Sequence, residues 1–359
     1  MFKKTMKTYK VGIIGLGGIN RWAHSLFYKK DKRVQVVAIC DILPDRAQQM
    51  HDEFYQNADI YTDYKELLKR DDLDAIDICT PNYLHSEIAI AALNAGKNVF
   101  CEKPDAISPE KAQAMKDAAD KNGKLLMIMR NNRFTDISKY AKKYIADGRM
   151  GEVYAGRACW QRRRGIPGKG GWFTTKEQSG GGPLIDLGVH MLDLAIWLMG
   201  NPTPVTVSGA TYCKFANNAS SDSANSAFGD AKADGIFDVE DLAMGFIRFD
   251  NGAVLQLEFS WASNVAAEHR FVELRGTKAG LTWMDGLTLD IYSEDEGRLT
   301  NTQLAGNLTD DGHVRNLENF FDALDGKAEP CFKPQQGIDM IKILDGIYRS
   351  AKTGHEVVL

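Results

Sequence analysis

The amino-acid sequence predicts two mixed domains: an N-terminal α/β domain with a doubly wound parallel sheet, then a C-terminal α/β domain with a large, mostly antiparallel sheet. In the first 130 residues, short apolar runs alternate with helical stretches, which is typical of βαβ units. From Val205 to Tyr292, strand-like segments follow one another with turns and without helices between them, which favours antiparallel pairing. The length of 359 residues also exceeds what a single hydrophobic core usually supports.

The predicted parallel sheet is formed by runs that are apolar almost throughout, as expected for strands covered on both faces. These strands are Lys10–Gly15, Val34–Cys40, Ala75–Thr80, Asn98–Cys101 and Leu125–Met129. Helices are indicated over Glu87–Asn94 and Pro109–Asn122. The second has Ser108 as its N-cap, a proline at its first position and Gly123 just after its end, which are the residues preferred there.

The second domain is expected to begin with a helix over Ile137–Ala146 and a strand within GEVYAGRACWQ (151–161). The Gly-rich, basic segment 162–182 is expected to lack regular structure, and an apolar helix follows over Leu184–Met199. The later strands are expected over Val205–Lys214, Leu242–Phe249, Ala253–Trp261, Arg270–Arg275, Leu281–Met284 and Thr288–Tyr292. The pair Asn251–Gly252 predicts a hairpin between two of them.

Two helices, Arg315–Leu324 and Gly337–Ala351, are expected near the end of the chain. The expected domain boundaries are 1–130 for the parallel sheet, 131–334 for the antiparallel sheet, and 335–359 for a C-terminal helix able to pack back on the first domain. The segment Asn217–Asp234 is poor in large apolar residues and is expected to be a long loop, either functional or disordered.

Charge and cysteine content narrow the class of protein. A net charge of −4 comes without the concentrated basic patch of a nucleic-acid-binding protein. The six cysteines are widely spaced with no C-x-x-C pair, which favours reduced, buried thiols in a cytoplasmic protein over disulfides or a zinc site. No apolar run reaches the roughly 18 residues of a membrane span. The N-terminal MFKKTMKTYKVGIIG also lacks the apolar core and cleavage site of a secretory signal.

The segment VGIIGLGGIN lies where the first strand meets the first helix. Gly15 permits a tight turn, and Gly17 allows a pyrophosphate to approach the helix N-terminus. The turn continues with Gly18, Ile19 and Asn20. Asp41, 26 residues after Gly15, can accept hydrogen bonds from a ribose diol and repels a 2′-phosphate. Glycine is common in any tight turn and an aspartate at a strand end can simply be solvated, but the combination predicts dinucleotide binding, with NAD favoured over NADP.

Two more loops at the carboxyl ends of predicted strands are expected to face the same crevice. The loop CTPNYLH supplies the candidate cofactor contacts Thr80, Pro81, Asn82 and His85, although an ordinary capped loop is an equal alternative. The segment NVFCEKP carries Glu102 and Lys103 to the end of a strand. A lysine there can stabilise the alkoxide that develops as hydride leaves a carbinol, and the alternative is a solvated Lys–Glu pair.

A candidate acid–base group lies in GGGPLIDLGVHMLDLAIW (180–197). Asp186 and His190 are four residues apart and share one face of the predicted helix, and Asp193 follows three residues later. An imidazole oriented by a carboxylate is a suitable general acid or base, whereas a buried histidine bonded to a structural aspartate is the alternative. The spacing also permits a metal pair, but no third ligand is near, so no metal is expected.

Taken in order, the GLGGIN turn, CEKP and GGG-x-x-x-D-x-G-x-H resemble the Gfo/Idh/MocA family of glucose–fructose oxidoreductase and inositol 2-dehydrogenase. Similar stretches extend over nearly the whole chain: NNRF at 131–134, IADGRMGEV at 145–153, DVEDLAMGFIRFDNG at 238–252 and IDMIKILDGIYRSAKTG at 338–354. The resemblance implies an NAD-binding Rossmann domain and a second domain whose open sheet forms homodimer or homotetramer interfaces.

In the same family, the lysine of the EKP motif and the aspartate and histidine of D-x-G-x-H form the catalytic group. The resemblance therefore implies catalytic roles for Lys103, Asp186 and His190. The chain departs from the family pattern at Asn20, where a glycine is common. It also departs after Trp172, because Phe173 stands where many members carry an arginine in a Trp-Arg pair that contacts the cofactor.

The basic run Arg162–Arg164 precedes the Gly-rich loop that leads to His190. An arginine fork can bind a carboxylate or phosphate, or the hydroxyls of a neutral sugar, and the flanking tryptophans offer aromatic faces to a pyranose ring. The candidate substrate contacts are Arg163, Arg164, Trp160 and Asp193. A solvated or subunit-interface loop is the alternative.

These observations together predict an NAD(H)-dependent dehydrogenase that acts on a secondary hydroxyl of a sugar, glycoside or cyclitol. One rival is a glycosidase that retains NAD and cleaves by transient oxidation and elimination. The other is a non-catalytic sugar- or nucleotide-sensing regulator, which would have no need for a base such as His190. Neither nucleic acid nor a membrane is an expected partner.

Overall fold

The computed structural model describes residues 7–217, 226, 228–306 and 311–359. The chain forms two compact units, one made of residues 1–129 and 313–338 and the other of residues 130–312 and 339–359. Residues 313–338, which the sequence grouped with the second domain or with the C-terminal helix, therefore cluster with unit 1.

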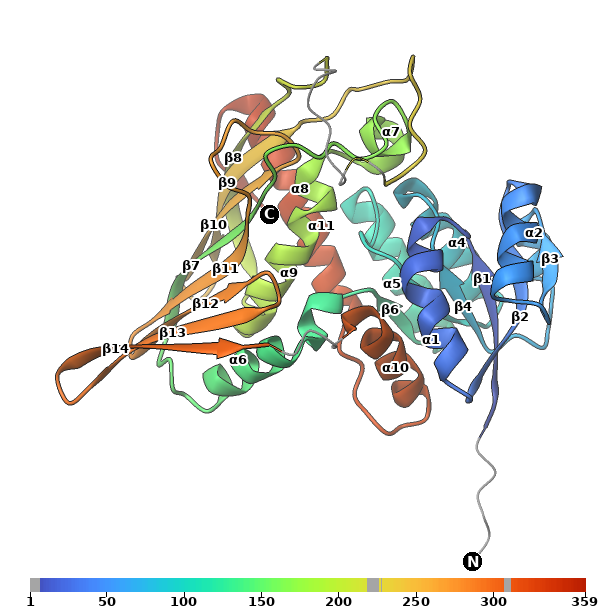
Figure 1. Cartoon of the computed structure of the whole chain (residues 1–359), viewed down its shortest axis with the longest axis horizontal. Helices are drawn as coiled ribbons and strands as arrows, with labels where there is room; N and C mark the ends of the chain where they lie inside the picture. Colours follow the sequence, from blue (N-terminus) through green and yellow to red (C-terminus); the bar gives the residue numbers. More distant parts are fainter. Residues whose placement is uncertain (1–6, 218–225, 227, 307–310) are drawn as a thin grey trace, which may run out of the picture. The chain divides into compact units, whose positions relative to one another are not determined.

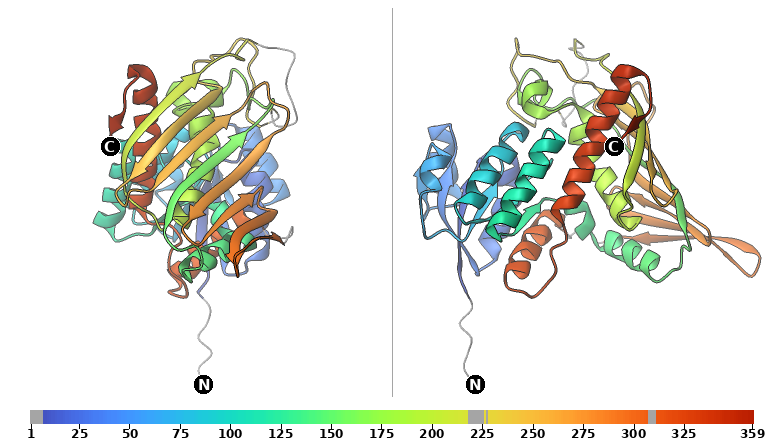
Figure 2. Two further views of the ribbon diagram at one scale, coloured as in Figure 1. Left: turned by 90° about the vertical axis from the view of Figure 1, so that its left-hand side faces the viewer. Right: turned by 180° about the vertical axis from the view of Figure 1, so that it is seen from behind.

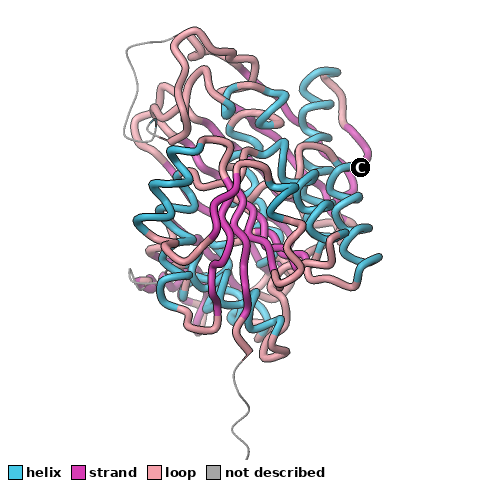
Figure 3. Tube along the Cα trace, turned by 90° about the vertical axis from the view of Figure 1, so that its right-hand side faces the viewer, coloured by secondary structure: helices cyan, strands magenta, loops and turns pink. Residues whose placement is uncertain are grey.

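Unit 1 contains a six-stranded sheet in which every neighbouring pair is parallel. Its strands are β1 (Tyr9–Ile14), β2 (Val34–Cys40), β3 (Asp59–Tyr61), β4 (Ala75–Ile78), β5 (Asn98–Cys101) and β6 (Leu126–Ile128). The order is β3-β2-β1-β4-β5-β6, so the direction of winding reverses between β1 and β4. Helices flank the sheet on both sides (Figure 3). This confirms the predicted doubly wound sheet, whose ligand crevice lies at the carboxyl ends of β1 and β4.

The helices of unit 1 begin and end at residues that suit those positions. They are η1 (Asn20–His24, a π-helical turn), α1 (Ser25–Lys30), α2 (Pro44–Glu53), α3 (Tyr64–Leu67), α4 (Asn82–Asn94), α5 (Pro109–Asn122) and α10 (Gly312–Leu324). Helix α5 has the predicted bounds: Ser108 caps it by accepting from the Lys111 N–H at 3.4 Å, and Gly123 ends it with φ at 58°. Helix α11 (Pro334–Thr353) has its first turn in unit 1 and the rest in unit 2.

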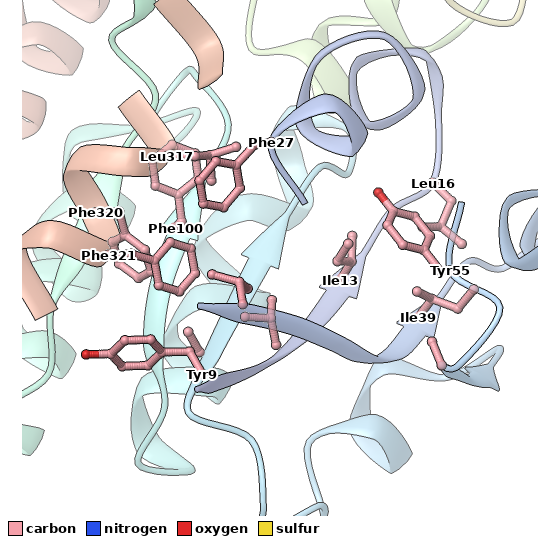
Figure 4. Packing of buried hydrophobic residues seen from close by; sticks show 14 of the residues in the cluster. Tyr9, Ile13, Leu16, Phe27, Ile39, Tyr55, Phe100, Leu317, Phe320 and Phe321 are labelled. Carbon is pink, nitrogen blue, oxygen red and sulfur yellow. The ribbon is translucent and has the colours of Figure 1, made fainter. Parts of the chain in front are cut away.

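Aromatic packing explains why α10 belongs to unit 1. Its Phe321 stacks on Phe27 of α1 with ring centroids 5.5 Å apart and also contacts Tyr9 of β1. Phe320 meets the edge of Phe100 from β5. These side chains converge in one buried cluster beside the sheet (Figure 4). The amphipathic helix α10 thus buries its apolar face against the parallel sheet.

Unit 2 is built on a nine-stranded sheet that is antiparallel except where β10 pairs with β7. Its strands are β7 (Val153–Gln161), β8 (Pro204–Tyr212), β9 (Leu242–Phe249), β10 (Val254–Ser260), β11 (His269–Gly276), β12 (Ala279–Met284), β13 (Thr288–Asp295), β14 (Arg298–Ala305) and β15 (Val357–Val358). The order is β14-β13-β12-β11-β7-β10-β9-β8-β15. The hairpin predicted at Asn251–Gly252 joins β9 to β10, and Gly252 has φ at 84°.

Helices cover one face of this sheet and leave the other open (Figures 1 and 2). The helical segments of unit 2 are η2 (Asn131–Phe134), α6 (Asp136–Ala146), η3 (Trp172–Thr174), α7 (Lys176–Ser179), α8 (Pro183–Asp186), α9 (Gly188–Leu198) and most of α11. Side chains alternate accordingly: in β9, Ala243 and Ile247 are fully buried, whereas Met244 and Arg248 are exposed. This is the pattern of an antiparallel sheet with one packed face.

Several predicted elements differ from the structure. The single helix expected over Leu184–Met199 is divided at Leu187 into α8 and α9, and the axis of Lys176–Asp186 makes an angle of 49° with that of α9. Gly188 permits this packing, since a Cβ there would lie 2.9 Å from the Phe259 ring. The fully described segment 162–182 contains the short η3 and α7. Strands β3, β14 and β15 were missed because they are short or mostly exposed edge strands without an apolar run.

Among the described residues, no single helix is long and apolar enough to cross a membrane; the bent pair Lys176–Asp186 and Gly188–Leu198 reaches that length and composition only jointly, which is weak evidence. None of the six cysteines, all of which are described, forms a disulfide. Cys213 is exposed and Cys331 is half-buried, which corrects the expectation that all the thiols are buried. Half of the predicted loop Asn217–Asp234, residues 218–225 and 227, lies outside the described residues, and its part from 228 onward contains turns and bends.

Candidate active site

The glycine turn after β1 is shaped by a close approach of the chain to β4. Gly15 has φ at 93°, and a Cβ there would lie 2.6 Å from the backbone of Cys79, so a side chain is excluded both by conformation and by space. At Gly17 a Cβ would meet no atom within 4 Å. The turn is therefore closed toward the sheet and open on its other side, which leaves room for a pyrophosphate at the following helix. Gly18 and Ile19 follow on this open side.

Asp41 is anchored at the end of β2 by the backbone. One carboxylate oxygen accepts from the N–H of Leu16 in the glycine turn, and the other accepts from the N–H of Leu43, both at 2.9 Å. The Arg46 guanidinium lies 3.8 Å away. Ile42, the next residue, is 81% exposed, so an apolar surface stands beside the carboxylate. These residues fit the ribose and base of a dinucleotide, and sequence reasoning missed Ile42 because its exposure is visible only in the structure.

The loop after β4 contains one polar atom that the protein leaves unsatisfied. The Thr80 hydroxyl is buried and has no hydrogen-bond partner, as expected for a group that contacts a cofactor. Asn82 is buried at the start of α4, after Pro81. His85 is fully buried, with its ring nitrogens 2.7 Å from the Pro104 carbonyl and 2.8 Å from that of Thr80, and burial lowers its pKa. The His85 side chain therefore connects the loops that contain Thr80 and Pro104, and its predicted place in the cofactor channel stays a prediction.

Glu102 and Lys103 follow β5, at the carboxyl end of the sheet. Glu102 is 5% exposed, and its carboxylate lies 2.9 Å from a ring nitrogen of His24 and accepts from the Lys103 N–H at 3.1 Å. Burial alone raises the pKa of Glu102, but the hydrogen bond and charge of His24 outweigh it and lower the pKa to about 2. Glu102 is thus buried against His24, and its predicted contact with a cofactor stays a prediction, while Lys103 is half-buried.

Asn20 also turns inward. It is fully buried, its carbonyl oxygen accepts from the Tyr55 hydroxyl at 2.9 Å, and its amide lies 3.9 Å from the Cys79 sulfur. The side chain of the residue that replaces the third glycine of the motif therefore contacts the core, and the predicted contact of Asn20 with a cofactor stays a prediction.

His24, Asp77 and Cys79 form a buried group of metal-type donors within 4.8 Å of one another. These atoms already contact one another, with the His24 ring 2.8 Å from Asp77 and 3.4 Å from the Cys79 sulfur. Burial raises the pKa of Cys79 to about 12. In this structure the three residues form a hydrogen-bonded cluster.

In unit 2, the GGG sequence lets the chain pass close to Glu240 and Tyr348. A Cβ at Gly181 would overlap the Tyr348 hydroxyl, and one at Gly182 would lie 2.0 Å from the Glu240 carbonyl. The Glu240 carboxylate accepts from the N–H groups of Gly182 and Leu184 at 2.9 and 3.1 Å. Glu240 thus caps the start of α8, the helix that carries Asp186.

Asp186 and His190 come from two helices joined at Leu187 and not from one continuous helix as predicted. Asp186 accepts from the indole N–H of the fully buried Trp261 at 3.0 Å. The ring of His190 lies 5.9 Å from that of Trp160 on β7. The carboxylate and the imidazole are thus each held by a tryptophan of the sheet that α8 and α9 cover.

Asp193 lies on α9 but is 4% exposed and accepts from two arginines. One oxygen accepts from Arg130 at 2.8 Å and from Arg133 at 2.6 Å, and the other accepts from Arg133 at 2.8 Å. This bidentate contact gives Asp193 a structural role, and its predicted contact with substrate stays a prediction.

Three side chains form a row on the helix-covered face of the sheet, next to His190. Arg270 of β11 lies directly opposite Trp160 in the strand register, and Arg162 follows Trp160 by two residues and so shares its face. The guanidinium carbons lie 4.3 and 5.2 Å from the centre of the Trp160 ring system. Arg270 donates to Asn132 at 2.9 Å, and its Nε is buried without a partner. Burial lowers the pKa of both arginines.

The other arginines of the basic run lie elsewhere. Arg163 is exposed, and its backbone N–H donates to Glu268. Arg164 donates to the Ser263 carbonyl at 2.9 Å and to Asn264 at 2.8 Å. Within the basic run, the arginine beside Trp160 is therefore Arg162, and the contacts of Arg163 and Arg164 with substrate stay predictions. Trp172 stacks on Phe173 with ring centroids 3.8 Å apart.

The strand order of unit 1, its glycine turn and the acid after β2 define a dinucleotide-binding Rossmann unit. Comparison with known proteins agrees: residues 9–129 match the model of an oxidoreductase family with an NAD-binding Rossmann fold, and residues 142–359 match that family's C-terminal α/β domain. The chain belongs to the Gfo/Idh/MocA family of NAD-binding sugar oxidoreductases, and the predicted resemblance is confirmed.

Several relatives are dehydrogenases of sugars. The chain is 34% identical over 356 residues to D-glucoside 3-dehydrogenase of Escherichia coli (strain K12), covering 99% of both chains. It is 31% identical to levoglucosan dehydrogenase of Pseudarthrobacter phenanthrenivorans over 77% of this chain and 74% of that one. A levoglucosan dehydrogenase structure in complex with NADH and levoglucosan superposes with a TM-score of 0.84 at 25% identity, covering 98% of this chain and 99% of the other.

Proposed function

We propose that this chain uses NAD(H) to oxidise a secondary hydroxyl of a sugar, glycoside or cyclitol, or to reduce the corresponding ketone. The observation that carries the proposal is Lys103, which follows β5 at the ligand crevice of a Rossmann unit whose glycine turn is open for a pyrophosphate. The matching relatives support the same class of reaction, since their names include a D-glucoside and a levoglucosan dehydrogenase.

In this proposal different residues assist the removal of the hydride and of the hydroxyl proton from a carbinol. NAD+ bound at the glycine turn and Asp41 accepts the hydride. The ammonium of Lys103 stabilises the alkoxide character that develops on the substrate oxygen. His190 accepts the hydroxyl proton and Asp186 orients it, although Lys103 and His190 are alternative candidates for the base. Lys103 and His190 belong to different units. Mutation of each residue and of both together tests whether they act on the same substrate.

We propose that NAD is preferred to NADP. The Asp41 carboxylate is held by two backbone N–H groups at the end of β2, where a 2′-phosphate would face a like charge. Arg46, 3.8 Å from Asp41, offsets part of that repulsion. Asp41→Ala should therefore narrow the preference, and Arg46→Ala should widen it. Equal kcat/KM with both cofactors in the wild-type enzyme would contradict this proposal.

We propose that the row formed by Trp160, Arg162 and Arg270 contacts the substrate beside His190. Arginines at positions that face the packed side of a sheet break the apolar pattern, which is typical of a functional site. The unpartnered Nε of Arg270 is a donor available to a substrate oxygen. The indole supplies an apolar face for a sugar ring.

The direct test is NADH absorbance with purified protein, both cofactors and a panel of sugars, cyclitols and 3-keto sugars. Turnover of at least one substrate that depends on Lys103 and His190 is the expected result. Release of a chromophore from a chromogenic glycoside without added NAD would instead identify the NAD-retaining glycosidase. Binding of a sugar or nucleotide without turnover would identify a sensor.

We also propose a cytoplasmic homodimer or homotetramer that associates through the open face of the nine-stranded sheet (Figure 2). That face carries exposed large side chains, among them Met244 and Tyr292, which are 38% and 42% exposed. Met244→Lys should shift the molar mass measured by light scattering toward the monomer if this face is the interface, and an unchanged mass would place the interface elsewhere.

A further inference from the structure

A chain of buried polar groups connects the helix after the glycine turn to Lys103. The His24 ring lies 2.8 Å from the Asp77 carboxylate through Nδ1 and 2.9 Å from the Glu102 carboxylate through Nε2. The other oxygen of Glu102 accepts from the Lys103 N–H at 3.1 Å. His24 is fully buried, and Asp77 and Glu102 are 1% and 5% exposed. All four residues belong to unit 1.

The geometry sets the number of protons on His24. A neutral imidazole has one N–H, so it can donate to only one of two carboxylates, whereas an imidazolium donates to both. Burial by itself lowers the pKa of His24, but the charge and hydrogen bond of Asp77, with the Cys79 thiol, outweigh burial and raise the pKa well above 6.5. The contacts of both ring nitrogens and the raised pKa together favour an imidazolium that bridges two buried carboxylates.

The surroundings hold the ring in this place. Tyr28 of α1 donates to the same Asp77 oxygen at 2.9 Å, and the Cys79 sulfur lies 3.4 Å from Nδ1. The Phe100 ring of β5 meets the imidazole edge-on at 5.9 Å. Tyr55, after α2, interacts electrostatically with Asp77, Cys79 and His24. The charges of His313 and Lys103 help to lower the pKa of Glu102. The ring is thus enclosed by groups from α1, β4, β5 and the segment after α2.

The backbone at His24 is also unusual. Residues Asn20–His24 form a π-helical turn, which is rare and occurs mainly at functional sites. The buried residues of this turn are Asn20, Ala23 and His24, so it directs both polar side chains inward. The turn that lies next to the pyrophosphate site therefore also delivers the group that reaches Glu102.

We propose that His24 is a positioning residue for Lys103: it holds the Glu102 carboxylate in place, and Glu102 in turn fixes the backbone of Lys103 at the crevice. The inference rests on the proposed function, because it concerns the lysine that the proposal places on the substrate oxygen. It adds a physical link between the cofactor turn and the catalytic lysine that passes through two side chains, those of His24 and Glu102. A displacement of about 1 Å at a reacting group can cost a factor of about 10² in rate.

The test compares His24→Gln with Tyr28→Phe as a matched control, since the second removes one hydrogen bond to Asp77 but keeps both bonds of His24. We expect His24→Gln to lower kcat by about 10–100-fold. The dissociation constant of ADP-ribose, measured by calorimetry, should stay within about threefold, because the glycine turn and Asp41 are intact. Tyr28→Phe should lose much less kcat. A kcat within about threefold of wild type in His24→Gln would overturn the proposal.

A double-mutant cycle separates positioning of Lys103 from general damage. If His24 acts through Lys103, adding His24→Gln to Lys103→Met should lower the residual kcat no further than about threefold. An equal loss in the Lys103→Met background and in the wild type would instead mean that His24 is merely structural.

A third readout does not depend on turnover. Hydrogen exchange of the Lys103 amide, followed by mass spectrometry of the peptide that contains it, should become at least about tenfold faster in His24→Gln and not in Tyr28→Phe. Absence of turnover in the wild type would defeat the proposed function, yet this exchange result would still decide whether His24 holds Lys103. Unchanged exchange would overturn the inference.

Discussion

Each of the two units buries a cluster of three ionisable groups, and the two clusters have opposite arrangements of charge. In unit 1, one histidine lies between two carboxylates, those of Asp77 and Glu102. In unit 2, the Asp193 carboxylate lies between Arg130 and Arg133. With His24 protonated, the first three groups sum to −1 and the second three to +1. The sign of the bridging group is reversed, and so is the net charge.

The difference lies in what each cluster can do when conditions change. A guanidinium stays protonated at any physiological pH, so the cluster of unit 2 is permanent. An imidazole titrates, so the cluster of unit 1 can lose its bridging charge. The titratable cluster adjoins Lys103, while the permanent one supports the helix that carries His190. Of these two clusters, the one in unit 1 is therefore sensitive to pH and the one in unit 2 is not.

The largest expected effect tests whether the two units act on one reaction. Lys103→Met and His190→Ala should each lower kcat by about 10²–10⁴-fold, the range for losing a positioned proton-transfer or charge-stabilising group. The double mutant should lose far less than the product of the two, because both residues act on the same transition state. Steady-state kinetics measures this, and the affinity for NAD should survive His190→Ala.

A turnover rate of His190→Ala within a few fold of wild type would refute the mechanism even though the fold stands. Fully multiplicative losses in the double mutant would also contradict it, since they would mean that the two residues act in separate steps. The kcat–pH profile should lose the limb that belongs to His190, whose neutral form accepts the proton.

The next largest effect concerns stability. Asp193→Asn leaves two guanidinium groups buried around a neutral amide, which should cost about 3–5 kcal/mol of the free energy of unfolding of unit 2. Asp147→Asn is the matched control, because Asp147 forms a solvent-exposed ion pair with Lys143. This substitution should lower the free energy of unfolding by less than about 1 kcal/mol. Hydrogen exchange of peptides from β9 and β10 measures unit 2 alone. Equal small losses in both variants would show that the arginines find other partners.

The sequence predicted those parts of the molecule that depend on local signals. Strands β2 and β9 and helix α5 have the predicted bounds, because unbroken apolar runs and caps such as Ser108 and Gly123 mark them. The glycine turn, Asp41 and Lys103 lie at the carboxyl ends of their strands as expected, since the βαβ pattern dictates that edge.

What the sequence did not predict depends on contacts between distant residues. The role of His24 requires a π-turn and carboxylates 53 and 78 residues away. Arg270 reaches Trp160 only through the pairing of β11 with β7. Asn20 was interpreted as a lost glycine, yet its partner Tyr55 fixes it in the core. None of these pairings leaves a local pattern.

A smaller effect on kcat/KM should distinguish Arg162 and Arg270 from Arg163 and Arg164. Arg270→Met and Arg162→Met should each lower kcat/KM for the sugar by about 10–100-fold, since a substrate oxygen loses its donor and the site loses a buried cation. The double variant Arg163→Ala, Arg164→Ala should change kcat/KM by no more than about threefold, because these side chains lie away from Trp160. A matched pair of a methyl glucoside and its uronate shows whether the row favours a charged substrate. A larger loss in the Arg163, Arg164 variant would restore the original prediction.

The smallest expected effect is the pH dependence of unit 1, and it tests the comparison directly. His24 has a pKa raised above 6.5 in the folded state, so its stabilisation is fully present below about pH 6.5 and is lost as the pH rises through the folded pKa. Glu102 has a pKa lowered from 4.5 to about 2, so its stabilisation is present above 4.5 and is lost as the pH falls toward 2. Both stabilising contributions are therefore complete between about pH 4.5 and 6.5.

Hydrogen exchange of peptides from β4 and β5 should show unit 1 losing stability on both sides of this window. In His24→Gln the alkaline loss should disappear while the β9 and β10 peptides of unit 2 stay unchanged. An alkaline loss of equal size in both units, or one that persists in His24→Gln, would show that the titrating group lies outside the His24 cluster.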